Sequence, residues 1–365
     1  GEKLRGFFAR KTQPLQLIDF GKVQNFEQAN VDTNILLFAK RAPQKPAIAV
    51  TIDEDFTGSG LDSYIYQNHT SFDGFSRDTW VIAAPLVQRI KQKAEQRGTP
   101  IKEWELQIYF GIKTGFNEAF ILDGKTKDEL IRRDANNAEI LRPLLKGRDI
   151  RKWSPVFSGF WLINAHNGVR EKGTSRIEVR KEYPTIFTWL EEFRDGLEKR
   201  QDKGDDWTNL RSCAYLEEFQ KPKILWADIM RISKSNPHDI PRFAYDESNY
   251  YPEATVFMMT GENLKYVLAL LNSRLLFYVF VKFYAGTIFD TEGIRYKKAF
   301  LENLPLARIS EPEQRPFVVL VDRILAAKRA DPAAAVSTLE AEIDRLVYQL
   351  YGLTDEEIAM VEGTM

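Results

Sequence analysis

The segment from Gly261 to Tyr284 most constrains the fold of this chain, because its apolar residues extend nearly all round a helix. A helix of that composition has no face suited to water and belongs inside a protein core. Its main polar break is Asn272-Ser273-Arg274. The longest apolar run, Leu275 to Val281, is far shorter than a membrane span. We therefore expect one long buried helix in a soluble protein, without a membrane partner.

Composition narrows the class further. The chain has 365 residues, of which 44% are hydrophobic and 28% charged, which suits two or three globular domains. Cys213 is the single cysteine, which excludes an internal disulfide and a paired-cysteine metal site and is compatible with the cytoplasm. His69, His166 and His238 lack the spacing of metal ligands, so we expect no metal. No signal peptide is visible at the first residues.

The net charge of −1 conceals an uneven distribution. The segment from Glu311 to Met365 holds 11 acidic and 5 basic residues, so the rest of the chain is basic. Basic residues also gather in three clusters, at 142–152, 170–181 and 295–298. Such patches can bind phosphates even in a neutral protein, although for any one cluster alone a solvated face is the favoured interpretation.

Hydrophobic patterning predicts a helix over 1–11 and strands over 15–20, 34–39 and 47–52, the second strand being apolar enough for the centre of a sheet. Too few elements are present there to bury both faces of a parallel sheet, so we expect residues 1–52 to belong to a larger domain. Residues 53–105 are irregular apart from a helix over 85–96.

Short strands alternate with helices from 106 to 310, with strands expected over 116–122, 160–164, 223–227 and 254–259. The tail, 311–365, is helical. In it Asp331-Pro332 is expected to open a helix, Gly352 to end it, and Thr354 with Glu357 to form a capping box.

Two short motifs look catalytic, but their contexts exclude the chemistry. Gly124-Lys-Thr126 lacks the upstream glycine of a phosphate-binding loop, because Ala119 stands in that place. Lys113-Thr-Gly115 would need a serine nucleophile in the pattern S-x-x-K, which the chain does not contain. Asp123-Gly-Lys125 has the D-x-K form but no Pro-Asp pair at a useful distance upstream, so we do not expect a nuclease site there.

Seven segments in order carry a family likeness. They are Leu15–Leu36, Gly111–Phe120, Leu141–Trp153, Lys221–Ile224, Leu268–Leu276, Tyr296–Pro305 and Glu342–Gly352. Together they resemble the C-terminal part of adenine-specific DNA methyltransferases with a TaqI-like specificity domain, as in Type IIG restriction-modification enzymes. The resemblance implies an α/β remnant of a methyltransferase core (1–52), a connecting segment (53–105), a mixed α+β specificity domain (106–310) and a helical tail (311–365).

The implied function is sequence-specific recognition of double-stranded DNA within an N6-adenine methyltransferase of a restriction-modification or phage-defence system. The family's Asn-Pro-Pro-Tyr motif and its glycine-rich turn for S-adenosylmethionine are absent and would precede residue 1. We therefore expect this chain alone to be inactive and without a cofactor, and S-adenosylmethionine to serve the intact parent. A missing N-terminal methyltransferase region would be its partner. The alternatives are a protein-interaction scaffold, a specificity subunit docking onto a separate catalytic subunit, and a standalone enzyme of unrelated chemistry.

Residues from three segments are predicted to contact DNA, because cations, hydroxyls and amides suit phosphates and base edges. They are Lys113, Thr114, Asn117, Lys146, Arg148, Arg151, Lys152, Arg295, Lys297 and Lys298. The alternatives are a strand-entry turn around Lys113, a carboxylate partner for Arg148 and a packed surface turn at 295–298.

The resemblance also makes Phe26 the platform on which a flipped adenine stacks, whereas a core residue beneath the sheet is the alternative. The tryptophans at 153, 161, 189 and 226 are expected in the core.

Overall fold

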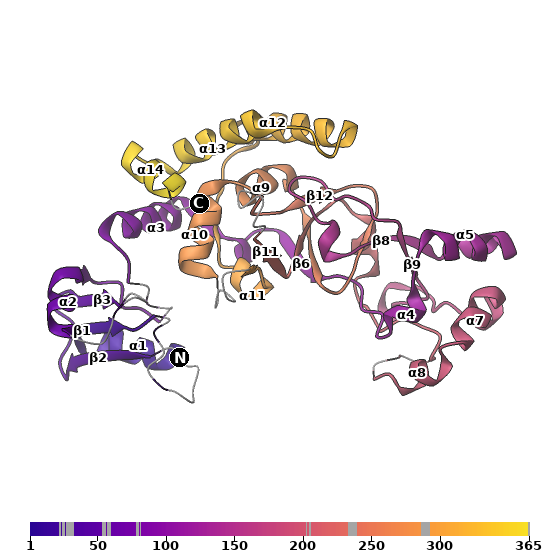
Figure 1. Ribbon diagram of the computed structural model, residues 1–365, viewed down its shortest axis with the longest axis horizontal. Coiled ribbons are helices and arrows are strands. Elements are labelled where there is room, and N and C mark those ends of the chain that lie inside the picture. The colour runs from indigo at the N-terminus through magenta and orange to yellow at the C-terminus, as the bar shows by residue number, and fades with distance from the viewer. Residues whose placement is uncertain are drawn as a thin grey trace. The chain divides into compact units, whose positions relative to one another are not determined.

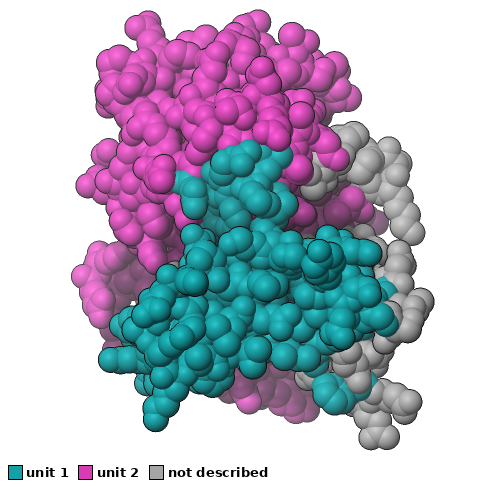
Figure 2. All heavy atoms as spheres, turned by 90° about the vertical axis from the view of Figure 1, so that its left-hand side faces the viewer, with its two compact units in different colours: residues 1–92 teal, residues 93–365 magenta. Residues whose placement is uncertain are grey.

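The structure is a computed structural model. It describes residues 1–363 apart from 22, 24–25, 27–32, 53–55, 57–59, 78–79, 81, 202, 204–205, 233–238 and 286–292. The chain divides into two compact units, residues 1–92 and 93–365 (Figure 2). Each unit is described by itself below, and helix α3 (Pro85–Arg97) crosses the division between them.

Unit 1 is built on a four-stranded sheet with the order β2-β1-β3-β4 (Figure 1). Its elements are α1 (Glu2–Lys11), β1 (Gln13–Asp19), β2 (Asn34–Ala39), β3 (Ala47–Thr51), α2 (Leu61–Asn68) and β4 (Thr70–Phe72). Strand β1 runs parallel to β3 and antiparallel to β2. Leu17 packs into a small core on one face of the sheet and Ile18 into another on the opposite face.

Strand β2 corrects one prediction. Its continuous apolar sequence predicts a central strand, but β2 lies at the edge of this sheet. Ile35 and Leu37 are 50% and 53% exposed, because β1 is the only described strand beside it. The strand itself was predicted correctly, but the burial of its side chains requires neighbouring elements that the described residues do not supply. Helix α2 and strand β4 were not predicted.

Two four-stranded sheets form the centre of unit 2. The first has the order β12 (Ala244–Asp246), β10 (Lys223–Ala227), β14 (Val256–Gly261) and β6 (Leu106–Phe110). The second has the order β13 (Tyr251–Pro252), β8 (Leu141–Leu145), β9 (Phe160–Ile163) and β7 (Ile121–Leu122). One apolar core joins both sheets, since Leu225 and Met258 of the first belong to the same buried cluster as Leu144 and Leu162 of the second.

Short ribbons and helices complete unit 2. Strand β11 (Ile229–Arg231) pairs with β15 (Gly293–Arg295), and β5 (Gly98–Pro100) pairs with β16 (Pro305–Ala307). The smaller helices are α4 (Asn117–Phe120), α5 (Gly124–Arg133), α6 (Val179–Glu182), α7 (Pro184–Glu191), α8 (Arg194–Lys199) and α11 (Lys298–Leu301). Residues 116–122, expected to be one strand, form α4 followed by β7.

The long apolar helix expected over 261–284 is broken in two. Helix α9 (Leu264–Leu271) ends at Asn272, and α10 (Arg274–Val279) starts after Ser273 and continues as a π-helical turn over Phe280–Tyr284. Asn272 accepts a hydrogen bond from the backbone N–H of Phe243 at 3.0 Å and donates one to its carbonyl at 2.9 Å. Asn272 thus bonds the backbone just before β12 at the point where the helix breaks, and the two pieces bend by 64°.

Both pieces are buried, as their composition predicts. Among the described residues no single helix is long and apolar enough to cross a membrane, and only the bent pair meets that test together, by length and composition alone.

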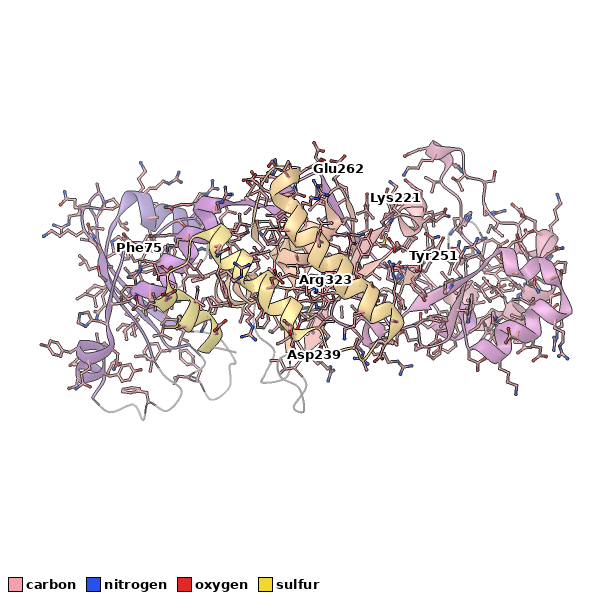
Figure 3. All side chains as sticks on the ribbon, turned by 90° about the horizontal axis from the view of Figure 1, so that it is seen from above. Phe75, Lys221, Asp239, Tyr251, Glu262 and Arg323 are labelled. Atoms are coloured by element: carbon pink, nitrogen blue, oxygen red, sulfur yellow. The ribbon has the colours of Figure 1, made fainter. Side chains whose placement is uncertain are left out.

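The C-terminal tail is helical, as predicted. It contains α12 (Glu311–Ala330), α13 (Ser337–Tyr351) and α14 (Asp355–Gly363), and α12 packs on α9 (Figures 1 and 3). Gly352 ends α13 in the left-handed conformation with φ 67°, and Thr354 and Glu357 form the expected cap of α14. Asp331 was wrongly placed: it closes α12 and caps a turn, because α13 begins six residues later.

Candidate nucleic-acid interface

Two glycines shape the loop that follows β6. A side chain on Gly111 would place its Cβ 2.1 Å from the Glu253 carbonyl oxygen, so only glycine lets the two backbones approach there. Gly115 adopts φ +76°, which also favours glycine. The loop between them is therefore held against the turn before β14, and it presents Lys113 to solvent.

Thr114 lies inside this loop rather than on its surface. Its hydroxyl donates to Asn117 Oδ1 at 2.5 Å and accepts from the Phe116 N–H at 3.2 Å, and its carbonyl accepts from Arg200 at 2.6 Å. These bonds fix the loop and leave Lys113 and Asn117 exposed. Contact of Thr114 with DNA stays a prediction, but its hydroxyl is already engaged.

The second predicted segment is a single tight turn after β8. Buried Asp149 accepts hydrogen bonds from the Lys146 N–H at 2.8 Å and from the Ser158 hydroxyl at 2.9 Å, so it holds the turn rather than pairing with Arg148. Lys146 Nζ lies 3.4 Å from the centroid of the Phe160 ring, and the Arg148 guanidinium lies 5.5 Å from it. Arg148 and Arg151 are exposed and form no ion pair with the described residues.

Lys152 is placed differently from its neighbours. Its ammonium pairs with Glu340 of α13 at 3.0 Å, and the Trp153 indole N–H donates to the same carboxylate at 2.6 Å. Burial acts to raise the pKa of Glu340, but Lys152 and Trp153 together hold that pKa below its ordinary value. The structure thus assigns Lys152 a role in attaching the helical tail, and its contact with DNA is untested.

The third segment lies on β15 and at the start of α11. Arg295 donates to Asp228 Oδ2 at 3.2 Å, and Lys298 donates to the Ile108 carbonyl at 3.2 Å. Tyr296 between them is buried and stacks on Phe280 at 4.2 Å, so it belongs to the core rather than to an aromatic surface. Its carbonyl accepts a hydrogen bond from Trp226, which is also buried.

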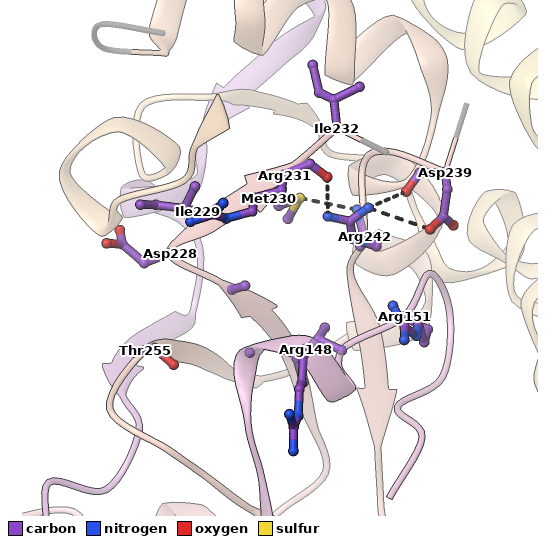
Figure 4. Close-up of a pocket in the computed structure, with 13 residues that line it drawn as sticks. Arg148, Arg151, Asp228, Ile229, Met230, Arg231, Ile232, Asp239, Arg242 and Thr255 are labelled. Carbon is purple, nitrogen blue, oxygen red and sulfur yellow. Dashed lines mark hydrogen bonds and ion pairs between the residues drawn. The ribbon is translucent and has the colours of Figure 1, made fainter. Parts of the chain in front are cut away.

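The second and third segments meet at two adjoining pockets. The arginine pocket, about 570 Å³, has Arg148 and Arg151 on one side and β11 on the other (Figure 4). Its lining residues are Gly147, Arg148, Ile150, Arg151, Ala227, Asp228, Ile229, Met230, Arg231, Ile232, Asp239, Arg242 and Thr255. The aromatic pocket, about 510 Å³, is lined by Phe110, Asp228, Ala254, Phe257, Arg295, Lys297, Lys298, Ala299 and Glu302. Asp228 lines both, so the two pockets adjoin at this residue.

Sequence reasoning missed Arg231 and Arg242 of the arginine pocket. Arg242 donates to the Arg231 carbonyl at 2.7 Å and lies 3.5 Å from Asp239, as the dashed lines in Figure 4 show. Burial lowers the pKa of Arg242, and Asp239 opposes that effect. Arg242 has no lysine or arginine within seven positions and Arg231 has only Lys234, so a search for clusters of basic residues could not find them.

The structure also places the other residues singled out in the sequence, namely Phe26, four tryptophans and Asp123. Phe26 is 56% exposed, which does not fit the buried alternative, while most of the residues around it lie outside the described part of the chain. The tryptophans at 153, 161, 189 and 226 are buried or packed against the core, as predicted. Asp123 accepts a hydrogen bond from the Thr126 N–H at 2.7 Å, so Asp123 to Thr126 is a helix cap. No metal-binding group of three His, Cys, Asp or Glu side chains occurs among the described residues.

Comparison with known proteins adds a family likeness for part of the chain. No curated protein matches the sequence. Among solved structures, the chain is similar to the Type IIL restriction-modification enzyme MmeI, determined in complex with DNA, with a TM-score of 0.56 and 13% identity. It also matches the Type IIG restriction endonuclease BpuSI with a TM-score of 0.43 and 12% identity.

The MmeI match covers 96% of this chain but 44% of MmeI, and the BpuSI match covers 96% of this chain and 45% of BpuSI. The chain therefore spans less than half the length of either enzyme, and at these identities the likeness to MmeI is one of fold. The family model of the TaqI-like C-terminal specificity domain matches residues 142–306, which include both basic segments at the two pockets. The resemblance to a TaqI-like specificity domain is confirmed over that range.

Proposed function

We propose that this chain is a DNA target-recognition module, and that the arginine and aromatic pockets form its DNA-binding surface. One observation carries the proposal. Basic residues from three parts of the sequence, at 148–151, at Arg231 and Arg242, and at 295–298, line two pockets that share Asp228. A polyanion is the ligand that such a concentration of cations favours.

The two kinds of cation in these pockets suit different contacts. Lys297 and Lys298 are flexible point charges suited to phosphates, which position a protein on DNA without reading its sequence. Arg148 and Arg151 are exposed and can form paired hydrogen bonds with guanine, the commonest specific contact in the major groove. Asp228 and Asp239 can accept from the amino group of cytosine. Together these groups could supply both affinity and sequence discrimination.

The comparisons support this assignment. The family model describes a specificity domain, and both pockets are built mainly from its matched range. MmeI, which shares the fold, was solved in complex with DNA. The proposal also extends to an intact parent enzyme, which would methylate adenine at N6 with S-adenosylmethionine. This chain alone would be inactive. The parent would act in the cytoplasm, where DNA is accessible.

Unit 1 would then be the end of a methyltransferase core. Its strand β2 supports this, because a strand with a continuous apolar run, here Ile35–Ala39, is typical of the interior of a sheet. An exposed apolar edge is also a site of unwanted pairing, which proteins normally cover. In the proposal a strand of the parent's N-terminal region pairs with the outer edge of β2.

The same exposed strand is the observation that favours the second candidate, a protein-interaction scaffold. Ile35, Leu37 and Ile48 lie on one face of the unit 1 sheet and are all half exposed. In that case a separate catalytic subunit would bind unit 1, and DNA affinity would be absent from the pockets.

The salt dependence of DNA binding separates the two candidates. Fluorescence anisotropy with duplex DNA over a range of salt concentrations gives a log–log slope proportional to the number of phosphate contacts. Replacing Arg148, Arg151, Lys297 and Lys298 by alanine should reduce the slope by about 3–4 units if each touches one phosphate.

Arg315, Arg323 and Arg345 make a control, since they are exposed arginines on α12 and α13 outside both pockets. Figure 3 labels Arg323 of α12. Their replacement should leave the slope unchanged. If the slope is unchanged in the four-residue variant, or falls only in the control variant, DNA does not bind at these pockets. It then binds elsewhere on the chain, or the protein is a scaffold.

A further inference from the structure

A row of aromatic rings crosses the first sheet of unit 2 and ends in the aromatic pocket. Trp226 of β10 is the register partner of Phe257 of β14, and Phe257 is the partner of Phe110 of β6. The rings of Trp226 and Phe257 stack 5.6 Å apart at 11°, and those of Phe257 and Phe110 lie 4.8 Å apart at 38°. The three side chains are 0%, 4% and 43% exposed, so the row opens to solvent at Phe110.

The position of Phe110 explains its exposure. It is the last residue of β6, which is the edge strand of the sheet. Leu106 and Ile108 point to the same side as Phe110, because side chains two apart on a strand share a face. Both are buried. Lys298 of α11 donates to the Ile108 carbonyl, whereas beyond Phe110 the Gly111 N–H donates to the Val256 carbonyl at 2.7 Å, which holds the backbone against the turn before β14. The apolar face that is buried at Leu106 and Ile108 therefore becomes exposed to solvent at Phe110.

Cations surround the open ring. Lys113 Nζ lies 4.9 Å from the centroid of Phe110, and Arg295, Lys297 and Lys298 line the same pocket. The acidic groups of the pocket are Asp228, which is paired with Arg295, and Glu302. A flat apolar surface within a cationic rim is complementary to a flat ring that carries a phosphate.

We infer that the aromatic pocket accepts one unstacked nucleobase of a locally opened DNA duplex, stacked on Phe110, while Lys297 and Lys298 hold the neighbouring phosphates. This inference rests on the proposed function of the two pockets. Bases stack on aromatic side chains whatever their sequence, since every base has a π face. Lys113 covers part of the ring in the free protein, and a cation over an exposed ring is held more weakly than a stacked base.

The test compares two duplexes of equal length, one fully paired and one carrying a single bulged adenine. Wild type should bind the bulged duplex more tightly in fluorescence anisotropy. Phe110→Leu keeps the apolar volume but removes the ring, and should weaken binding of the bulged duplex about 5- to 150-fold, which corresponds to about 1–3 kcal/mol. Phe110→Trp should retain the preference, and Phe110→Leu should weaken binding of the bulged duplex by a larger factor than binding of the paired duplex.

Tyr66→Leu is a control, because it removes an aromatic ring from unit 1 that is more exposed than Phe110, 81% against 43%. It should change neither affinity. Thermal unfolding of each variant checks that the fold persists. A third arm uses deoxyadenosine monophosphate as the competitor. Little competition is expected, since a free nucleotide lacks the duplex phosphates, whereas full competition would assign the pocket to free nucleotides and overturn the inference.

The outcomes separate this inference from the proposed function. If wild type binds neither duplex, the proposed function fails and the inference fails with it. If wild type binds both duplexes equally and Phe110→Leu changes neither affinity, the base site is refuted while the DNA-binding surface stands. Equal weakening of both duplexes by Phe110→Leu would also refute the base site, because the ring would then only support the pocket.

Discussion

The buried ion pair between Lys223 and Asp246 offers a sharp test of the packing of unit 2. These residues are register partners on β10 and β12, and they are 0% and 1% exposed. Lys223 Nζ lies 2.7 Å from Asp246 Oδ2 and also donates to the carbonyls of Phe219 at 2.7 Å and Lys221 at 3.2 Å. All three ammonium hydrogens are used.

Asp246 is equally engaged. It accepts from the Ser248 N–H at 2.8 Å and the Tyr250 N–H at 3.2 Å, which shapes the turn into β13. Lys223→Met would keep the volume of the side chain but leave the carboxylate buried and unpaired. Breaking a buried pair in this way costs about 3–5 kcal/mol, whereas a matched apolar replacement of both partners is often nearly neutral. We therefore expect Lys223→Met to be strongly destabilised.

Urea unfolding followed by tryptophan fluorescence is a suitable assay, because six of the seven tryptophans lie in unit 2. Adding Asp246→Asn to Lys223→Met removes the unpaired charge but keeps an acceptor for Ser248. The double variant should recover about 2 kcal/mol or more of the loss. If Lys223→Met were as stable as wild type, or the double variant no better than the single one, the pair would not have the role that its geometry indicates.

Two further variants test the tail and the loop after β6. Burial raises the pKa of Asp344 from 3.8 to about 6, against the opposing Arg274 N–H and Lys152. The folded state then binds the proton of the Asp344 carboxyl more tightly than the unfolded chain does. The stability that this protonation contributes is therefore lost as pH rises through about 4–6. Urea unfolding should show Asp344→Asn more stable than wild type by about 1–3 kcal/mol above pH 6 and similar below pH 4; an advantage independent of pH would contradict this. Gly111→Ala should destabilise the chain and weaken DNA binding, whereas Gly124→Ala, whose Cβ meets nothing nearer than 3.8 Å, should do neither, as melting and anisotropy can show.

The features predicted best from the sequence are those that depend on residues close together along the chain. Helix α3, strands β9, β10 and β14 and the caps at Gly352 and Thr354 follow from local patterns and were found where expected. The burial of 264–280 also followed from composition, but its break did not. That break depends on Asn272 meeting Phe243, 29 residues away.

The candidate site shows the same division. Cationic clusters pointed to Arg148, Lys297 and Lys298, and the structure places all three in pockets. Lys152 belonged to the same cluster, yet it pairs with Glu340, which is 188 residues further along the chain and could not be foreseen as its partner. The row from Trp226 to Phe110 depends on strand register, which a single sequence does not specify for strands so far apart.

Hydrogen–deuterium exchange of the chain with and without duplex DNA tests the central claim most directly. The account predicts slower exchange on DNA binding in residues 145–151, 228–232 and 293–299, which build the two pockets, and no change along α12. Protection confined to the unit 1 sheet or to α12, with the pocket segments exchanging as in the free protein, would contradict it.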